Sequence, residues 1–172
     1  GSEMCIRDSG YTKEKYLELV KLVRKYVPNA TITTDIIVGF PGETEENFEE
    51  TLDVVRQVGF TSAYTFIYSK RSGTPAAKME NQVPLAVKKE RLNRLMALQN
   101  ENSLKCHEKL VGQTVEVLAE GPSKQKTVWN GRTRTGVLVL WPIEDKQYEV
   151  GQKVNVQIEA AQTWLVKGKA VD

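Results

Sequence analysis

Two patterns that follow one another along the chain constrain its fold more than any other sequence feature. Up to about residue 110, apolar residues recur at helical and strand spacing in the order helix, strand, helix, strand, helix. After Gly112 the chain carries only short alternating stretches separated by turn residues. The first pattern is typical of parallel strands joined by crossover helices, and the second of a small β-barrel. The sequence therefore predicts an α/β part followed by an all-β part.

Capping residues and glycines delimit the helices expected in the α/β part. Thr12 caps a first helix that ends before Pro28, and Thr44 caps a second that closes at Gly59. A third, long helix opens at Pro84. The strands are predicted at residues 30–38 and 60–69. Because two parallel strands do not form a stable sheet alone, we expect this part to belong to a larger α/β sheet or barrel.

The all-β part is predicted to hold about five short strands. A turn is expected at Gly121-Pro122, and Asn130-Gly131 is typical of a β-hairpin. Five short strands without a helix favour a small closed barrel of the OB type.

The composition excludes several classes of protein. No apolar run approaches the ~18–20 residues of a membrane span, so no membrane partner is expected. The two cysteines, Cys5 and Cys106, are too few for a disulfide framework or a cysteine-bound cluster, and they favour a reducing, cytoplasmic environment. The net charge is only +2, so a nucleic-acid site requires a local basic patch. The single histidine, His107, is predicted to lie on the surface.

Residues 1–9 do not continue the pattern of the helix that follows them. Gly1-Ser2 resembles the scar of an expression tag, and the next residues show no helical spacing. We expect this segment to be a tag or sequence artefact. The alternative is a frayed native N-terminus.

The segment from Asp35 to Thr44 joins the first strand to the second helix. Ligands of α/β folds bind at the carboxyl ends of parallel strands, and the glycines of this segment allow close approach of the backbone. A carboxylate in an apolar strand requires a partner when it is buried. Asp35 is therefore either a ligand-binding residue or a structural residue with a protein partner, and the residues alone favour neither.

The loop from Tyr68 to Ala77 follows the second strand and is expected at the same end of the sheet. Arg71 in this loop can offer a bidentate site for a carboxylate. The alternative is a solvated arginine on the surface.

A basic stretch in the all-β part has no acidic residue between Gly121 and Ile143. Cations interleaved with an aromatic residue suit phosphate contact and base stacking, as in OB-type barrels. The alternative is a solvated hairpin with the tryptophan in the core. The candidate RNA-binding residues are Lys124, Lys126, Trp129, Arg132 and Arg134.

Several long segments together resemble the radical SAM methylthiotransferases. They are residues 34–44, 65–77, 88–92, 110–124 and 131–135, the last of which is similar to the C-terminal TRAM domain of that family. The resemblance implies the C-terminal half of a radical SAM barrel, a partial TIM-like barrel, over residues 10–106. It implies an RNA-binding TRAM barrel over residues 107–172. The tRNA-modifying branch fits best, because its sister enzymes that act on a ribosomal protein tend to have an acidic residue where Lys70-Arg71-Ser72 stands.

The resemblance implies a parent enzyme that uses SAM and two 4Fe–4S clusters to methylthiolate C2 of isopentenyladenosine beside the anticodon of tRNA. The family binds one of these clusters through a CxxxCxxC motif, which this sequence lacks. We expect no metal ligand and no catalytic residue in this chain, and no methylthiolation by it alone. The tRNA anticodon arm is the expected partner.

By position within the family, six residues are expected to face the adenosyl part of SAM or the cavity around it: Asp35, Ile37, Gly39, Glu43, Tyr68 and Arg71. Two alternatives remain for the function. One is a fragment of the ribosomal-protein methylthiotransferase, and the other is a TRAM-type RNA-binding module without enzymatic activity.

Overall fold

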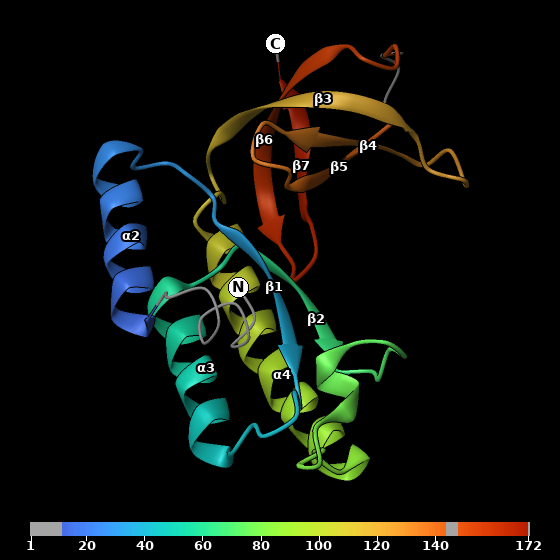
Figure 1. Ribbon diagram of the computed structural model, residues 1–172. Helices are drawn as coiled ribbons and strands as arrows, with labels where there is room; N and C mark the ends of the chain where they lie inside the picture. The colour runs from blue at the N-terminus through green and yellow to red at the C-terminus, as the bar shows by residue number, and fades with distance from the viewer. Residues whose placement is uncertain (1–11, 144–147, 172) are drawn as a thin grey trace. The chain divides into compact units, whose positions relative to one another are not determined.

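The computed structural model describes residues 12–143 and 148–171 (Figure 1). The chain divides into two compact units between Asn102 and Ser103. The tag predicted at residues 1–9 lies outside the described residues. No helix in the described part of the chain is long and apolar enough to cross a membrane.

The first unit contains the predicted order of helix, strand, helix, strand, helix. A short 3₁₀-helix, Pro75–Lys78, follows the second strand. The elements are α2 (Lys13–Tyr26), β1 (Thr33–Val38), α3 (Glu45–Val58), β2 (Ser62–Ile67) and α4 (Leu85–Glu108). The α/β class predicted for this part is confirmed.

The predicted helix caps are present in the structure. The Thr12 hydroxyl accepts a hydrogen bond from the backbone N–H of Lys15. At the start of α3, Thr44 and Asn47 form a reciprocal capping box, in which each side chain accepts the other's backbone N–H at 3.1–3.2 Å. These bonds satisfy amide donors that the first helical turn leaves free.

Strands β1 and β2 pair in parallel, from Thr33 opposite Ser62 to Val38 opposite Ile67. One face of this sheet carries Ile36 and Val38, which are buried in a core cluster. Residues of all three helices complete this cluster: Val20, Phe48, Leu52, Val54, Val55, Val58 and Leu95. The helices of this unit therefore cover one face of the sheet.

The opposite face of the same sheet is open. Tyr64 is 72% exposed and Phe66 is 51% exposed, and Asp35 lies on this face opposite Tyr64 in the register. Among the described residues, β1 pairs only with β2. This open face and the unpaired edge agree with the expectation that the two strands belong to a larger sheet or barrel.

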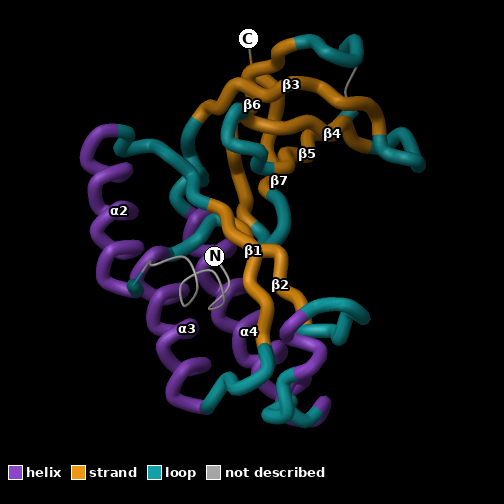
Figure 2. Tube along the Cα trace, viewed as in Figure 1, coloured by secondary structure: helices purple, strands orange, loops and turns teal. Residues whose placement is uncertain are grey.

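The second unit is a closed five-stranded barrel with strand order β3-β4-β5-β7-β6. Its strands are β3 (Thr114–Pro122), β4 (Val128–Thr133), β5 (Leu138–Pro142), β6 (Lys153–Ala161) and β7 (Val166–Val171). All neighbouring pairs are antiparallel except β5 and β7. Figure 2 shows these strands following one another without an intervening helix. The predicted OB-like barrel is confirmed.

Both turn predictions in the barrel were wrong. Gly121-Pro122 ends β3, after an irregularity in its pairing with β4, and the turn follows at Ser123–Lys126. Asn130-Gly131 lies inside β4, and the hairpin turn is at residues 133–136 instead. A Cβ on Gly131 would lie 2.4 Å from the backbone oxygen of Leu118. The glycine is therefore required by close approach of two strands and not by a turn.

The barrel core holds an aromatic cluster. Trp129 and Trp141 stack with ring centroids 6.3 Å apart, and Tyr148 packs edge-on against both. His107 is also buried, and its Nδ1 lies 2.7 Å from the carbonyl oxygen of Gln162. The predicted surface position of His107 was wrong, because the last turn of α4 packs against the chain between β6 and β7.

Candidate cofactor pocket and nucleic-acid surface

A cavity of about 550 Å³ opens at the carboxyl ends of β1 and β2. Three of the six predicted cofactor residues, Ile37, Tyr68 and Arg71, line it. The other lining residues are Phe40, Phe66, Ile67, Ser69, Thr74 and Ala76. The rule that ligands bind at strand ends therefore brings half of the predicted set together.

Tyr68 contributes a buried polar atom to this cavity. Its hydroxyl has no hydrogen-bond partner among the described residues, while its ring packs edge-on against Phe40 at 5.1 Å. Lys88 of α4 places its Nζ 4.9 Å from the centre of the same ring and donates a hydrogen bond to the Tyr68 carbonyl oxygen at 3.1 Å. Burial lowers the pKa of Lys88, and repulsion from Lys70 adds to the effect. The Tyr68 ring is thus packed between Phe40 and Lys88, and its buried hydroxyl is left without a protein partner among the described residues.

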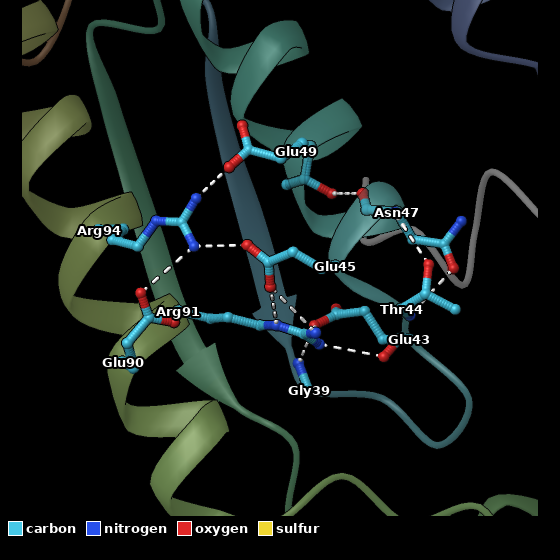
Figure 3. A network of polar contacts seen from close by, with 10 residues as sticks. Gly39, Glu43, Thr44, Glu45, Asn47, Glu49, Glu90, Arg91 and Arg94 are labelled. Atoms are coloured by element: carbon cyan, nitrogen blue, oxygen red, sulfur yellow. Dashed lines mark hydrogen bonds and ion pairs between the residues drawn. The ribbon is translucent and has the colours of Figure 1, made fainter.

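A buried ion pair fixes the turn between β1 and α3 (Figure 3). Glu43 accepts a hydrogen bond from the backbone N–H of Gly39 at 3.0 Å and pairs with Arg91 of α4 at 2.6 Å. Arg91 also donates to the backbone carbonyl of Glu43 at 3.1 Å. Arg91 is 4% exposed and Glu43 is 7% exposed. Glu43 was predicted to bind the cofactor, but its carboxylate already accepts hydrogen bonds from Gly39 and Arg91. The geometry therefore assigns Glu43 to positioning Gly39.

Gly39 needs its glycine for two reasons. Its φ is +73°, in the left-handed region, and a Cβ there would lie 2.4 Å from Cγ of Lys88. Lys88 and Arg91 are three residues apart on α4 and hold the segments after β2 and β1, respectively. Neither of these two α4 residues belongs to the set of site residues predicted from the sequence.

A second arginine of α4 extends the network to the surface. Arg94 pairs with Glu45 at 2.6 Å, with Glu90 at 3.2 Å and with Glu49 (Figure 3). Its hydrogen bond lowers the pKa of Glu45. These groups are about half exposed, so the network is screened by solvent far more than the pair beneath it.

Asp35 is exposed on the open face of the sheet and is not among the residues that line the cavity. Asp35 and its register partner Tyr64 lie two residues before Ile37 and Phe66, which do line the cavity. The described residues therefore leave Asp35 exposed, and an exposed carboxylate requires no protein partner.

The predicted RNA-binding residues of the barrel separate into three environments. Lys124 and Lys126 are exposed in the turn between β3 and β4. Arg132 pairs with Glu120 at 3.2 Å, and Arg134, which is almost fully exposed, approaches Glu116 at 3.9 Å. The two arginines are therefore partly neutralised by acids of β3.

Trp129 is the exception in that set, because only 7% of it is exposed. Its ring stacks on Trp141 inside the barrel, which agrees with the alternative of a solvated hairpin with the tryptophan in the core. Trp129 shares the inward face of β4 with the buried Gly131, because residues two apart on a strand point to the same side. A buried ring cannot stack on a base, so the structure assigns Trp129 to the core.

Comparison with known proteins extends these observations. The model of the radical SAM superfamily matches residues 4–55, and that of the TRAM domain matches residues 108–171. The fold and these matches define a protein that joins a radical SAM region to a TRAM barrel.

Curated relatives of the chain include several proteins named tRNA-2-methylthio-N(6)-dimethylallyladenosine synthase. Those from Moorella thermoacetica, Bacillus cytotoxicus and Acetivibrio thermocellus are 56%, 54% and 49% identical over 94–95% of this chain. The chain spans about a third of their length (36%, 32% and 33%). The chain is therefore similar to the part of these synthases that joins a radical SAM region to a TRAM domain.

No group of three or more His, Cys, Asp or Glu side chains that could hold a metal ion occurs within residues 12–143 and 148–171. The family implies SAM and iron–sulfur clusters for the whole enzyme. SAM is the cofactor against which the described residues can be tested.

Proposed function

We propose that this chain supplies one wall of a SAM pocket and an RNA-docking barrel to an enzyme that methylthiolates C2 of isopentenyladenosine beside the anticodon of tRNA. The observation that carries the proposal is the cavity at the carboxyl ends of β1 and β2. The chain that forms it is 56% identical to a tRNA-2-methylthio-N(6)-dimethylallyladenosine synthase. A cytoplasmic location follows from a tRNA substrate.

The cavity fits SAM by its chemistry. Phe40, Phe66 and Ile37 offer an apolar wall for the adenine ring, and the unpartnered hydroxyl of Tyr68 offers a polar contact. Arg71 suits the carboxylate of the methionine part. In the whole enzyme, SAM supplies a radical initiator and a methyl group. The residues described here bind and orient that group, while Arg91 and Glu43 position Gly39 at the end of β1.

The chain cannot complete the reaction alone. Two 4Fe–4S clusters usually take several thiolates each, and the sequence contains two cysteines. We therefore expect this chain to bind SAM and RNA. We expect no methylthiolation without the part of the whole enzyme that binds the clusters.

The barrel is proposed to hold the anticodon arm. Lys124 and Lys126 are exposed and form no ion pair among the described residues, whereas Arg132 and Arg134 share their charges with glutamates. All four are proposed to contact phosphate, with the larger share from the lysines.

The test is binding of an isopentenylated anticodon stem-loop RNA to the chain over a salt series. Each lost phosphate contact lowers the slope of log K against log salt by about 0.7–0.9. Lys124→Ala/Lys126→Ala should flatten the slope, and Arg132→Ala/Arg134→Ala should flatten it less. Val150→Ala, an exposed apolar change on the same barrel, serves as the control. Binding that is absent, or indifferent to salt and to both double variants, would refute the RNA role.

A further inference from the structure

The barrel exposes one tryptophan and buries two. Trp164 is 67% exposed, whereas Trp129 and Trp141 are stacked in the core. These three are all the tryptophans of the chain. A large aromatic ring in water is costly, and exposed tryptophans are enriched where a partner covers the ring.

The register of the barrel fixes where Trp164 lies. The turn that contains it is closed by a hydrogen bond from the N–H of Gln162 to the oxygen of Leu165. Immediately after this turn, Val166 of β7 lies beside Val139 near the start of β5. The neighbouring residue of β5, Leu138, pairs with Arg132 at the end of β4. The Trp164 turn therefore lies at one end of the β4–β5 pair.

The lysine-bearing turn lies at the other end of the same pair. Val128 begins β4 and pairs with Pro142, which ends β5. The turn of Lys124 and Lys126 comes directly before Val128. Between the two turns, the outer face of the pair presents the half-buried side chains of Asn130, Leu138 and Leu140.

The order β3-β4-β5-β7-β6 makes β4 and β5 the second and third strands of the barrel. In OB-type barrels, single-stranded nucleic acids bind across strands two and three, between the loop joining strands one and two and the loop joining strands four and five. Here these loops are the lysine-bearing turn and the Trp164 turn.

Charge on this face favours a polyanion. Lys167 of β7 is exposed and pairs with Leu140 of β5, so its cation borders the same face. The acids Glu116 and Glu120 lie on β3 and are paired with Arg134 and Arg132. Two lysines at one end of the face, Lys167 along its border and an exposed ring at the other end fit a single-stranded segment of RNA.

We propose that an unpaired base of RNA stacks on Trp164, and that the strand crosses β4 and β5 toward Lys124 and Lys126. This inference rests on the proposed RNA-docking function and names its surface. It replaces Trp129 by Trp164 as the stacking residue and adds Lys167 as a phosphate contact.

The first test compares affinities of the whole chain for the isopentenylated anticodon stem-loop. Loss of one base-stacking ring corresponds to a rise in Kd of about tenfold. Trp164→Ala should show this rise, and Trp164→Phe should keep most of the affinity because phenylalanine also stacks. Val150→Ala, which is equally exposed on the same unit, should bind as the unchanged chain does.

The second test uses the fluorescence of Trp164 itself. Stacking on a base quenches an exposed indole, so RNA should quench the emission of the chain but not that of Trp164→Phe. The buried Trp129 and Trp141 remain as reporters of the fold in that variant. Their unchanged unfolding transition would show that any loss of affinity is not a loss of structure.

The outcomes separate this inference from the function on which it rests. Salt-dependent RNA binding with no quenching, and with Trp164→Ala as tight as the unchanged chain, would overturn the Trp164 surface and leave RNA docking intact. No binding of RNA by the unchanged chain would overturn both.

Discussion

Replacing Arg91 by alanine is expected to destabilise the first unit strongly. The substitution leaves the Glu43 carboxylate buried, with the backbone N–H of Gly39 as its remaining donor among the described residues. Removing one partner of a buried ion pair typically costs about 3–5 kcal/mol. Because Glu43 keeps one donor, we expect the lower end of this range, about 3 kcal/mol, which is a factor of more than 100 in the folding equilibrium.

The chain offers separate reporters for its two units. All three tryptophans lie in the second unit, so their fluorescence follows the barrel. Most of the helical residues lie in the first unit, so far-ultraviolet circular dichroism follows it. In urea, Arg91→Ala should move the dichroism transition to lower denaturant and leave the fluorescence transition in place.

Arg94→Ala is the matched control, since it removes the same side chain one helical turn later. Its ion pairs with three glutamates are about half exposed and are worth about 0–1 kcal/mol each at most. A Glu43→Gln/Arg91→Met double variant should recover part of the loss, because no charge remains buried. Equal effects of Arg91→Ala and Arg94→Ala, or a shift of the barrel transition, would refute the reasoning.

Three further predictions concern close packing, pH and the open sheet face. Gly131→Ala should destabilise the barrel by about 1–3 kcal/mol in tryptophan-monitored unfolding, since its Cβ would meet the Leu118 oxygen; an unchanged midpoint would contradict this. Because Arg94 lowers the pKa of Glu45 below its ordinary 4.5, the pair stabilises the fold above that pH and loses this effect as pH falls through the lower value. Arg94→Ala should therefore make unfolding less sensitive to acid, and an identical pH profile would argue against it. Phe66→Ser should reduce self-association in sedimentation velocity without lowering the unfolding midpoint. Unchanged association would show that the open sheet face does not mediate self-association.

Local chemistry made the elements of the first unit predictable. A hydroxyl at an N-cap acts within three residues, so Thr12 and Thr44 could be assigned from the sequence. The same locality failed at Gly131, because a glycine that serves a turn and one that serves a close strand contact look alike in sequence. The Leu118 backbone that distinguishes them lies on another strand.

The candidate site was predictable where position along a strand decides it. The resemblance to the family implies Ile37, Tyr68 and Arg71, and the rule that strand ends meet at one edge of a sheet explains why their segments lie together. The role of Arg91 did not follow, because its partner Glu43 is 48 residues away and on another element. Whether Trp129 or Trp164 faces solvent depends on which strands close the barrel, which the spacing of charges does not specify.

The closed order of β3 to β7 has a consequence for how such a unit is inherited. In a barrel closed by the pairing of β3 with β6, the strands hydrogen-bond to one another around the whole sheet. Such a barrel requires no strand from another part of the gene product. A gene segment encoding it can therefore be fused to unrelated enzymes and still encode a stable module. The pair β1 and β2, open on one face, gains its remaining neighbours only when it is inherited together with the rest of its sheet.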